Sequence, residues 1–221
     1  MPFYFLFQIM AYRDFSLEKL EHKFGVRNQE RRLFGEVQPV HPSPDLVKAL
    51  RKAEELPIRS EKAKSEAIVF PLLLELRDLT QKFFTFYSGD ILNADAAKGL
   101  YGECDFLLCV DIGSFSLSYP IVVIVEAKKN DIELGVPQCA AQMLGALIYN
   151  QKKGMDMERI YGCVTTGDEW VFLKLENNLV TVDSRKFYLN QIEQVLGVFQ
   201  VILAEQKQFF EQLQDRELMP A

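Results

Sequence analysis

The amino-acid sequence predicts an α/β sandwich, in which helices pack against a mixed β-sheet. Two apolar runs bounded by Gly, Ser and Pro, residues 105–110 and 121–125, are typical of central strands covered on both faces. A helical segment over residues 134–150 separates the second run from a further strand at 159–166. Because a helical crossover joins these two strands, we expect them to be parallel. The order of elements, helix, three strands, helix, strands and helix, therefore indicates a mixed sheet.

Two short helices are expected ahead of the sheet, over residues 17–23 and 46–55. Ser16 and Asp45 are suitable residues to cap their first turns. Residues 26–44 between them are polar and contain three prolines, so we expect an extended arm there.

A longer helix is expected over residues 61–84, where apolar side chains recur with the helical period. Pro71 should kink it, because proline lacks a backbone donor and clashes with the preceding turn. Residues 82–87 are aromatic and favour a first strand, and residues 91–101 are expected to form a loop leading to the strand at 105–110.

After the parallel strand, residues 169–175 and 179–183 are expected to pair as an antiparallel hairpin. A helix over 189–213 follows. The apolar residues 1–10 are interpreted as a packed strand, or as residues ahead of an alternative start at Met10. They lack the basic region and cleavage site of a secretory signal, and are too short to cross a bilayer.

The composition is that of a globular protein able to bury a sizeable core, with 221 residues of which 48% are hydrophobic and 25% charged. The net charge of −6 argues against a basic nucleic-acid coat, although divalent cations and a local basic patch can offset it. The four cysteines form no CxxC pair and there are two histidines, which favours free thiols in a reducing cytoplasm over a zinc site. Motifs of nucleotide-binding loops, serine hydrolases and zinc proteases are absent.

Asp105 opens the first central apolar run, and Glu126 and Lys128 follow the second. Because side chains alternate along a strand, Glu126 and Lys128 project from the same face. The short connection between the runs allows a hairpin, which brings Asp105 onto the neighbouring strand. Charges beside a core are costly unless they are paired or bind a metal, so this is the candidate site. The alternative is an ordinary strand-end ion pair between Glu126 and Lys128.

The order of these residues resembles the PD-(D/E)xK nuclease superfamily, which has the restriction-endonuclease-like fold. The residues that carry the resemblance are Glu66 on a helix, Asp105 and then Glu126-Ala127-Lys128 on paired strands, and Gln138 and Gln142 on the following helix. Residues 161–172 also resemble the strand-turn-hairpin in the nuclease domain of type I restriction-enzyme R subunits. The resemblance covers about residues 60–185, and Cys104 stands where the family name has proline.

The resemblance implies that Asp105 and Glu126 bind Mg²⁺, for which Mn²⁺ can substitute, with a carbonyl near Ala127 as a further ligand. Hard carboxylate and water oxygens are the ligands that Mg²⁺ prefers. Glu66 would complete the metal shell, although acidic residues early in a helix are also favoured by its dipole. Lys128 would orient the attacking water and stabilise charge on the phosphate.

The remaining candidates surround this set. Gln142 would support the catalytic residues, and Gln138 and Lys129 would contact the nucleic acid; Gln138 could instead help to cap its helix. Glu103 is expected to face away from Asp105.

The resemblance predicts a restriction-endonuclease-like α/β/α sandwich over residues 60–221, with a central mixed sheet and an appended hairpin, preceded by an arm over 1–59. The expected function is Mg²⁺-dependent cleavage of DNA in restriction, defence or repair. The alternative is a catalytically silent module that binds protein or nucleic acid within a larger complex. The expected partners are DNA and a second copy or a larger restriction or defence complex, in the cytoplasm and without a membrane.

Overall fold

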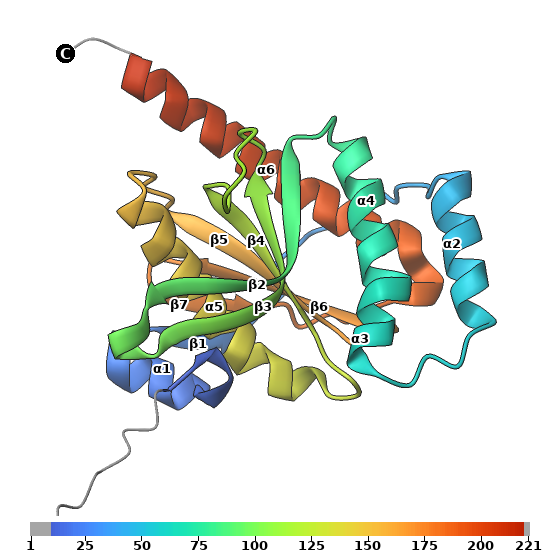
Figure 1. Ribbon diagram of the computed structural model, residues 1–221, viewed down its shortest axis with the longest axis horizontal. Helices are drawn as coiled ribbons and strands as arrows, with labels where there is room; N and C mark the ends of the chain where they lie inside the picture. Colours follow the sequence, from blue (N-terminus) through green and yellow to red (C-terminus); the bar gives the residue numbers. More distant parts are fainter. Residues whose placement is uncertain (1–9, 219–221) are drawn as a thin grey trace, which may run out of the picture.

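The computed structural model describes residues 10–218, with the side chains of residues 10–215 (Figure 1). The interpretation of residues 1–9 lies outside this range. The described part of the chain forms an eight-stranded mixed sheet in the order β1-β7-β6-β5-β4-β3-β2, with β8 paired to β6. The strands are β1 (Arg27–Glu30), β2 (Phe84–Asp95), β3 (Leu100–Val110), β4 (Ile121–Ala127), β5 (Arg159–Thr165), β6 (Glu169–Glu176), β7 (Leu179–Val182) and β8 (Phe187–Tyr188).

Helices cover both faces of this sheet. They are α1 (Leu17–Phe24), α2 (Pro44–Glu54), α3 (Glu61–Lys64), α4 (Phe70–Leu79), α5 (Ile132–Lys152) and α6 (Ile192–Leu218), with a π-helical turn η2 (Ser65–Val69) and 3₁₀ turns η1 (Tyr12–Asp14), η3 (Ala96–Lys98) and η4 (Leu189–Gln191). One apolar cluster joins α2, α4 and α6 to one face, and a second joins η1, α1 and α5 to the other (Figure 1). The expected α/β sandwich with a mixed sheet is confirmed.

The pairings expected at the centre of the sheet are also confirmed. β3 and β4 are antiparallel, β4 and β5 are parallel across the α5 crossover, and β6 and β7 form the hairpin. All seven residues of β4 are buried, as its continuous apolar sequence predicts. The four cysteines are free and buried. This centre positions the residues of the candidate site.

The structure differs from the prediction in two connections. Residues 27–30, expected within the arm, form β1, which pairs in parallel with β7 at the sheet edge. Residues 91–95, expected in a loop, continue β2 as the partner of β3, with a register shift between Asn93 and Asp95. The pairing of β1 with β7 joins part of the expected arm to the main sheet.

The helices also differ at their ends. α2 begins at Pro44, with Ser43 as its cap in place of Asp45. The long helix stops at Leu79 instead of residue 84 and contains the π-helical turn just before α4. Because Pro71 cannot donate to the carbonyl of Ala67, a wider turn at this point accommodates the missing hydrogen bond.

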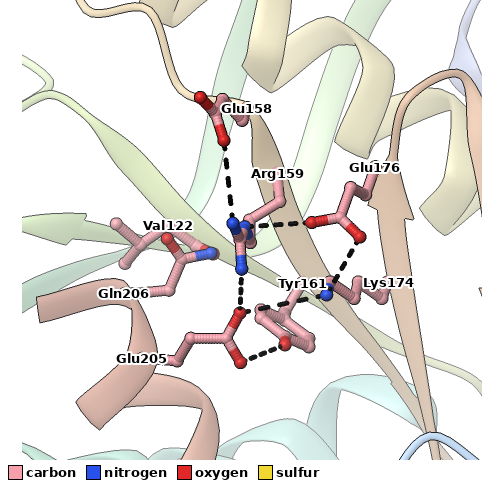
Figure 2. A network of polar contacts seen from close by, with 8 residues as sticks. All are labelled: Val122, Glu158, Arg159, Tyr161, Lys174, Glu176, Glu205 and Gln206. Carbon is pink, nitrogen blue, oxygen red and sulfur yellow. Dashed lines mark hydrogen bonds and ion pairs between the residues drawn. The ribbon is translucent and has the colours of Figure 1, made fainter. Parts of the chain in front are cut away.

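A polar network attaches α6 to the sheet (Figure 2). Arg159 Nη1 and the Tyr161 hydroxyl, both on β5, each donate to the carboxylate of Glu205 at 2.7 Å. On β6, Glu176 lies 3.1 Å from Arg159 Nε and 3.2 Å from Lys174 Nζ. The network therefore links one helix to two strands on the face away from α5.

Candidate active site

The site begins where β3 and β4 run side by side. Phe106 pairs with Val125, so the next residue on β4 lies beside Asp105. Asp105 Oδ2 accepts a hydrogen bond of 2.7 Å from the backbone N–H of Ala127. This contact fixes the Asp105 carboxylate next to Glu126.

Glu126 is held at both carboxylate oxygens. Lys128 Nζ donates to Oε1 at 2.6 Å, and Gln142 Nε2 donates to Oε2 at 2.7 Å. Glu126 is 1% exposed and Gln142 is fully buried. The predicted shared face of Glu126 and Lys128 is confirmed, and α5 brings Gln142 to the same carboxylate.

Helix α5 can approach the site because Gly135 faces it. A Cβ at this position would overlap Val164 on β5 and come within 3.0 Å of Lys128 Cγ. One helical turn later, Gln138 Oε1 accepts a 3.0 Å hydrogen bond from Lys128 Nζ. The predicted nucleic-acid contact Gln138 therefore lies against Lys128.

The site opens into a cavity of about 420 Å³, here called the central cavity. Its walls bring together four acidic residues, two basic residues and a few others: Glu61, Glu103, Asp105, Glu126, Lys128, Arg13, Ala11, Tyr12, Gly102 and Gln138. Residues from η1, α3, β3, β4 and α5 thus meet at one point.

Glu103 and Glu61 are absent from the sequence prediction of the site. The expectation that Glu103 faces away from Asp105 is wrong, because residues two apart on a strand share a face, and both line the central cavity. That spacing could have identified Glu103. Glu61 begins α3, and no local pattern distinguishes it from an ordinary first-turn acid.

Two predicted residues lie elsewhere. The Glu66 side chain is 67% exposed and lies 3.8 Å from Lys62 Nζ. It lines a neighbouring cavity of about 490 Å³ that also borders Asp105 and Glu61, but it does not line the central cavity with Glu126. Lys129 is exposed and lines neither cavity.

Burial and repulsion from neighbouring acids raise the pKa values of the two acids at the site, Asp105 and Glu126. Burial, and then the charge of Asp105, raise the pKa of Glu126 to about 7, against the lowering effect of Lys128 and Gln142. Burial also raises the pKa of Asp105. Burial opposes protonation of Lys128, but the adjacent Glu126 outweighs it and the pKa of Lys128 rises. The site thus holds more carboxylate than its single ammonium neutralises.

This donor set fits a hard divalent cation. Asp105 and Glu126 offer carboxylate oxygens beside a polar cavity, and added positive charge would relieve their repulsion. Among the described residues, no three His, Cys, Asp or Glu side chains form a ready metal cluster. Mg²⁺ is commonly held by one or two protein carboxylates and keeps several waters, so a pair of acids is a sufficient protein contribution for such an ion.

No protein-family model and no curated protein matches the chain. Among the described residues, no helix has the length and apolar character needed to cross a membrane.

Proposed function

We propose that this protein is a Mg²⁺-dependent nuclease that hydrolyses phosphodiester bonds in DNA, in restriction, defence or repair. One observation carries the proposal. Asp105 and Glu126, on adjacent strands, border a single cavity together with Lys128. The proposal includes the restriction-endonuclease-like version of the fold and a reducing cytoplasm, where the buried thiols stay free.

Each side chain has a role in this proposal. Asp105 and Glu126 would hold the cation, with Mn²⁺ able to replace Mg²⁺. When bound, the cation supplies charge stabilisation at the phosphate and lowers the pKa of a bound water. Gln142 keeps Glu126 in one orientation through the 2.7 Å hydrogen bond. Both acids are needed in the ionised form, so raised pKa values favour activity above neutral pH.

Lys128 is suited to contact the reacting groups. An ammonium has three donor hydrogens, and two of those on Lys128 go to Glu126 and Gln138. The third is available to a water or a phosphate oxygen in the central cavity. The ordered contacts to Glu126 and Gln138 would hold that donor in a fixed direction.

The net charge of −6 favours a second candidate, a catalytically silent module that acts through protein contacts. Polyanionic DNA is bound chiefly through basic side chains, and an acidic chain offers few of them in excess. In the nuclease proposal, a homodimer or a larger complex would supply the missing basic surface.

The test is cleavage of plasmid, linear duplex and single-stranded DNA with Mg²⁺, with Mn²⁺ and with chelator. Wild type is compared with Glu126→Ala and Lys128→Ala from identical preparations. The nuclease proposal expects metal-dependent cleavage that both substitutions abolish. A folded wild type that is inactive on every substrate favours the silent module, and cleavage unchanged by either substitution refutes the assigned site.

A further inference from the structure

A segment outside the resemblance reaches the candidate site. Tyr12 of η1 is 1% exposed and packs against Gly145 of α5 and Gly102 of β3. A Cβ on Gly145 would overlap the Tyr12 ring, and one on Gly102 would lie 3.3 Å from it. The two glycines thus make the space that Tyr12 fills, and Tyr12 anchors the N-terminal turn beside the central cavity.

The turn around this anchor is ordered by local contacts. The backbone N–H of Ala11 donates to Asp14 Oδ2 at 2.8 Å, and Lys19 Nζ donates to the Asp14 carbonyl at 2.8 Å. Phe15, the next residue, is buried. Arg13 therefore projects from a turn whose neighbours on both sides are fixed, and it lines the central cavity.

The charges in the cavity leave Arg13 free for a ligand. Lys128, the other basic residue of the wall, is paired with Glu126 at 2.6 Å. Within residues 10–215, the Arg13 side chain makes no ion pair or hydrogen bond, although four carboxylates line the same cavity. A guanidinium presents paired N–H donors that match two oxygens of a phosphate.

We propose that Arg13 is a substrate-binding residue that contacts a backbone phosphate next to the bond to be cleaved. This inference rests on the proposed function, because it requires a nucleic-acid strand in the central cavity. In this arrangement Arg13 and the two carboxylates proposed to bind the metal, Asp105 and Glu126, line one cavity. The N-terminal turn then contributes to DNA binding, a role that the family resemblance does not assign to residues 1–59.

The experiment measures binding of a short fluorescein-labelled DNA by anisotropy over a series of salt concentrations, with Ca²⁺ in place of Mg²⁺ to suppress cleavage. Wild type is compared with three variants, Arg13→Gln, Arg13→Lys and Arg27→Gln. Arg13→Lys keeps the positive charge but lacks the paired N–H donors of the guanidinium. Arg27 is an exposed arginine on β1, at the opposite end of the strand order from β2, and lies outside both cavities, so it controls for the change in net charge.

Arg13→Gln is expected to weaken binding about tenfold and to reduce the slope of log K against log salt by about 0.9 for duplex or 0.7 for single strands. Arg13→Lys should retain the slope with weaker binding, and Arg27→Gln should match wild type. Equal effects of Arg13→Gln and Arg27→Gln, or an unchanged slope in Arg13→Gln, overturn the inference.

Cleavage assays of the same proteins separate this inference from the proposed function. A wild type that cleaves, with Arg13→Gln as active and as tightly bound as wild type, refutes the role of Arg13 alone. A wild type that does not cleave but binds DNA through Arg13 refutes the nuclease and keeps Arg13 as a phosphate contact of a DNA-binding module. Absence of any DNA binding by wild type refutes both.

Discussion

Asp105 and Glu126 are coupled through one peptide group, because Asp105 accepts the N–H of Ala127, the residue that follows Glu126 on β4. Glu126 is held in turn by Lys128 and Gln142. Neither carboxylate can turn away from the other without losing a hydrogen bond. The fold therefore keeps two acids close together beside a cavity, and their repulsion makes a cation favourable there.

The first prediction concerns pH. The pKa of Glu126 is about 7 in the folded protein and 4.5 as its ordinary value. Protonated Glu126 therefore contributes to stability fully below about pH 4.5, and this contribution is lost as the pH rises through about 7. Without metal, urea unfolding should show wild-type stability falling from pH 5 to pH 8.

Glu126→Gln is the matched variant for that measurement. It removes the titrating group and should flatten the decline, leaving the smaller part contributed by the raised pKa of Asp105. Added Mg²⁺ should restore wild-type stability at pH 8 more than at pH 5, because the cation binds ionised carboxylates. An equal decline in Glu126→Gln and wild type would contradict the shifted pKa of Glu126.

The second prediction distinguishes the two helical acids near the site. Glu61 lines the central cavity, whereas Glu66 is exposed beside Lys62. Glu61→Gln should therefore reduce the rise in melting temperature that Mg²⁺ gives, and Glu66→Gln should leave most of it, since only Glu61 shares the cavity with Glu126. The opposite ranking in a thermal-shift titration would support Glu66 as the residue that completes the metal shell.

The third prediction tests the anchor of the N-terminal turn. Gly145→Ala places a methyl group against the Tyr12 ring and should destabilise the protein by about 1–3 kcal/mol through overpacking. The sign is diagnostic, because alanine is otherwise favoured over glycine inside a helix by about 1 kcal/mol. Denaturant unfolding measures the difference. A stabilised Gly145→Ala would mean that Tyr12 is not packed against α5.

The fourth prediction concerns the network that holds α6. Glu205→Ala leaves the buried Tyr161 hydroxyl and Nη1 of Arg159 without their acceptor and should cost about 2 kcal/mol of stability. Glu211→Ala, at an exposed position of the same helix, should stay within about 0.5 kcal/mol of wild type. Both variants should keep the response to Mg²⁺. Equal stability of the two variants in urea would show that the network is not stabilising.

The central sheet was predictable because its strands are buried on both faces and their sequences are continuously apolar. The edge strand β1 could not be predicted from its sequence, because the sequence is polar, Arg27-Asn28-Gln29-Glu30. Its pairing with β7 is set by tertiary contacts. The C-terminal half of β2 was missed for a related reason. Its residues 88–91 are exposed, so the sequence there lacks the apolar pattern of a buried strand.

The same distinction applies to the candidate site. Alternation along one strand places Glu126 and Lys128 together, and a short connection brings in Asp105. The family resemblance gives Gln142 a supporting role, and its hydrogen bond to Glu126 is known only from the structure. Glu61 and Arg13 come from separate N-terminal elements whose approach depends on packing, and no local pattern identifies them.

The most direct test of the central claim is the single-turnover rate of Mg²⁺-dependent DNA cleavage by Asp105→Asn, Glu126→Gln and Glu211→Gln. The first two substitutions preserve shape while removing a carboxylate charge from the site, and the third removes the same charge from an exposed part of α6. We predict rates at least about 100-fold below wild type for Asp105→Asn and Glu126→Gln, and a wild-type rate for Glu211→Gln. Cleavage at the wild-type rate by Asp105→Asn or by Glu126→Gln would contradict the assignment of Asp105 and Glu126 as the metal-binding acids.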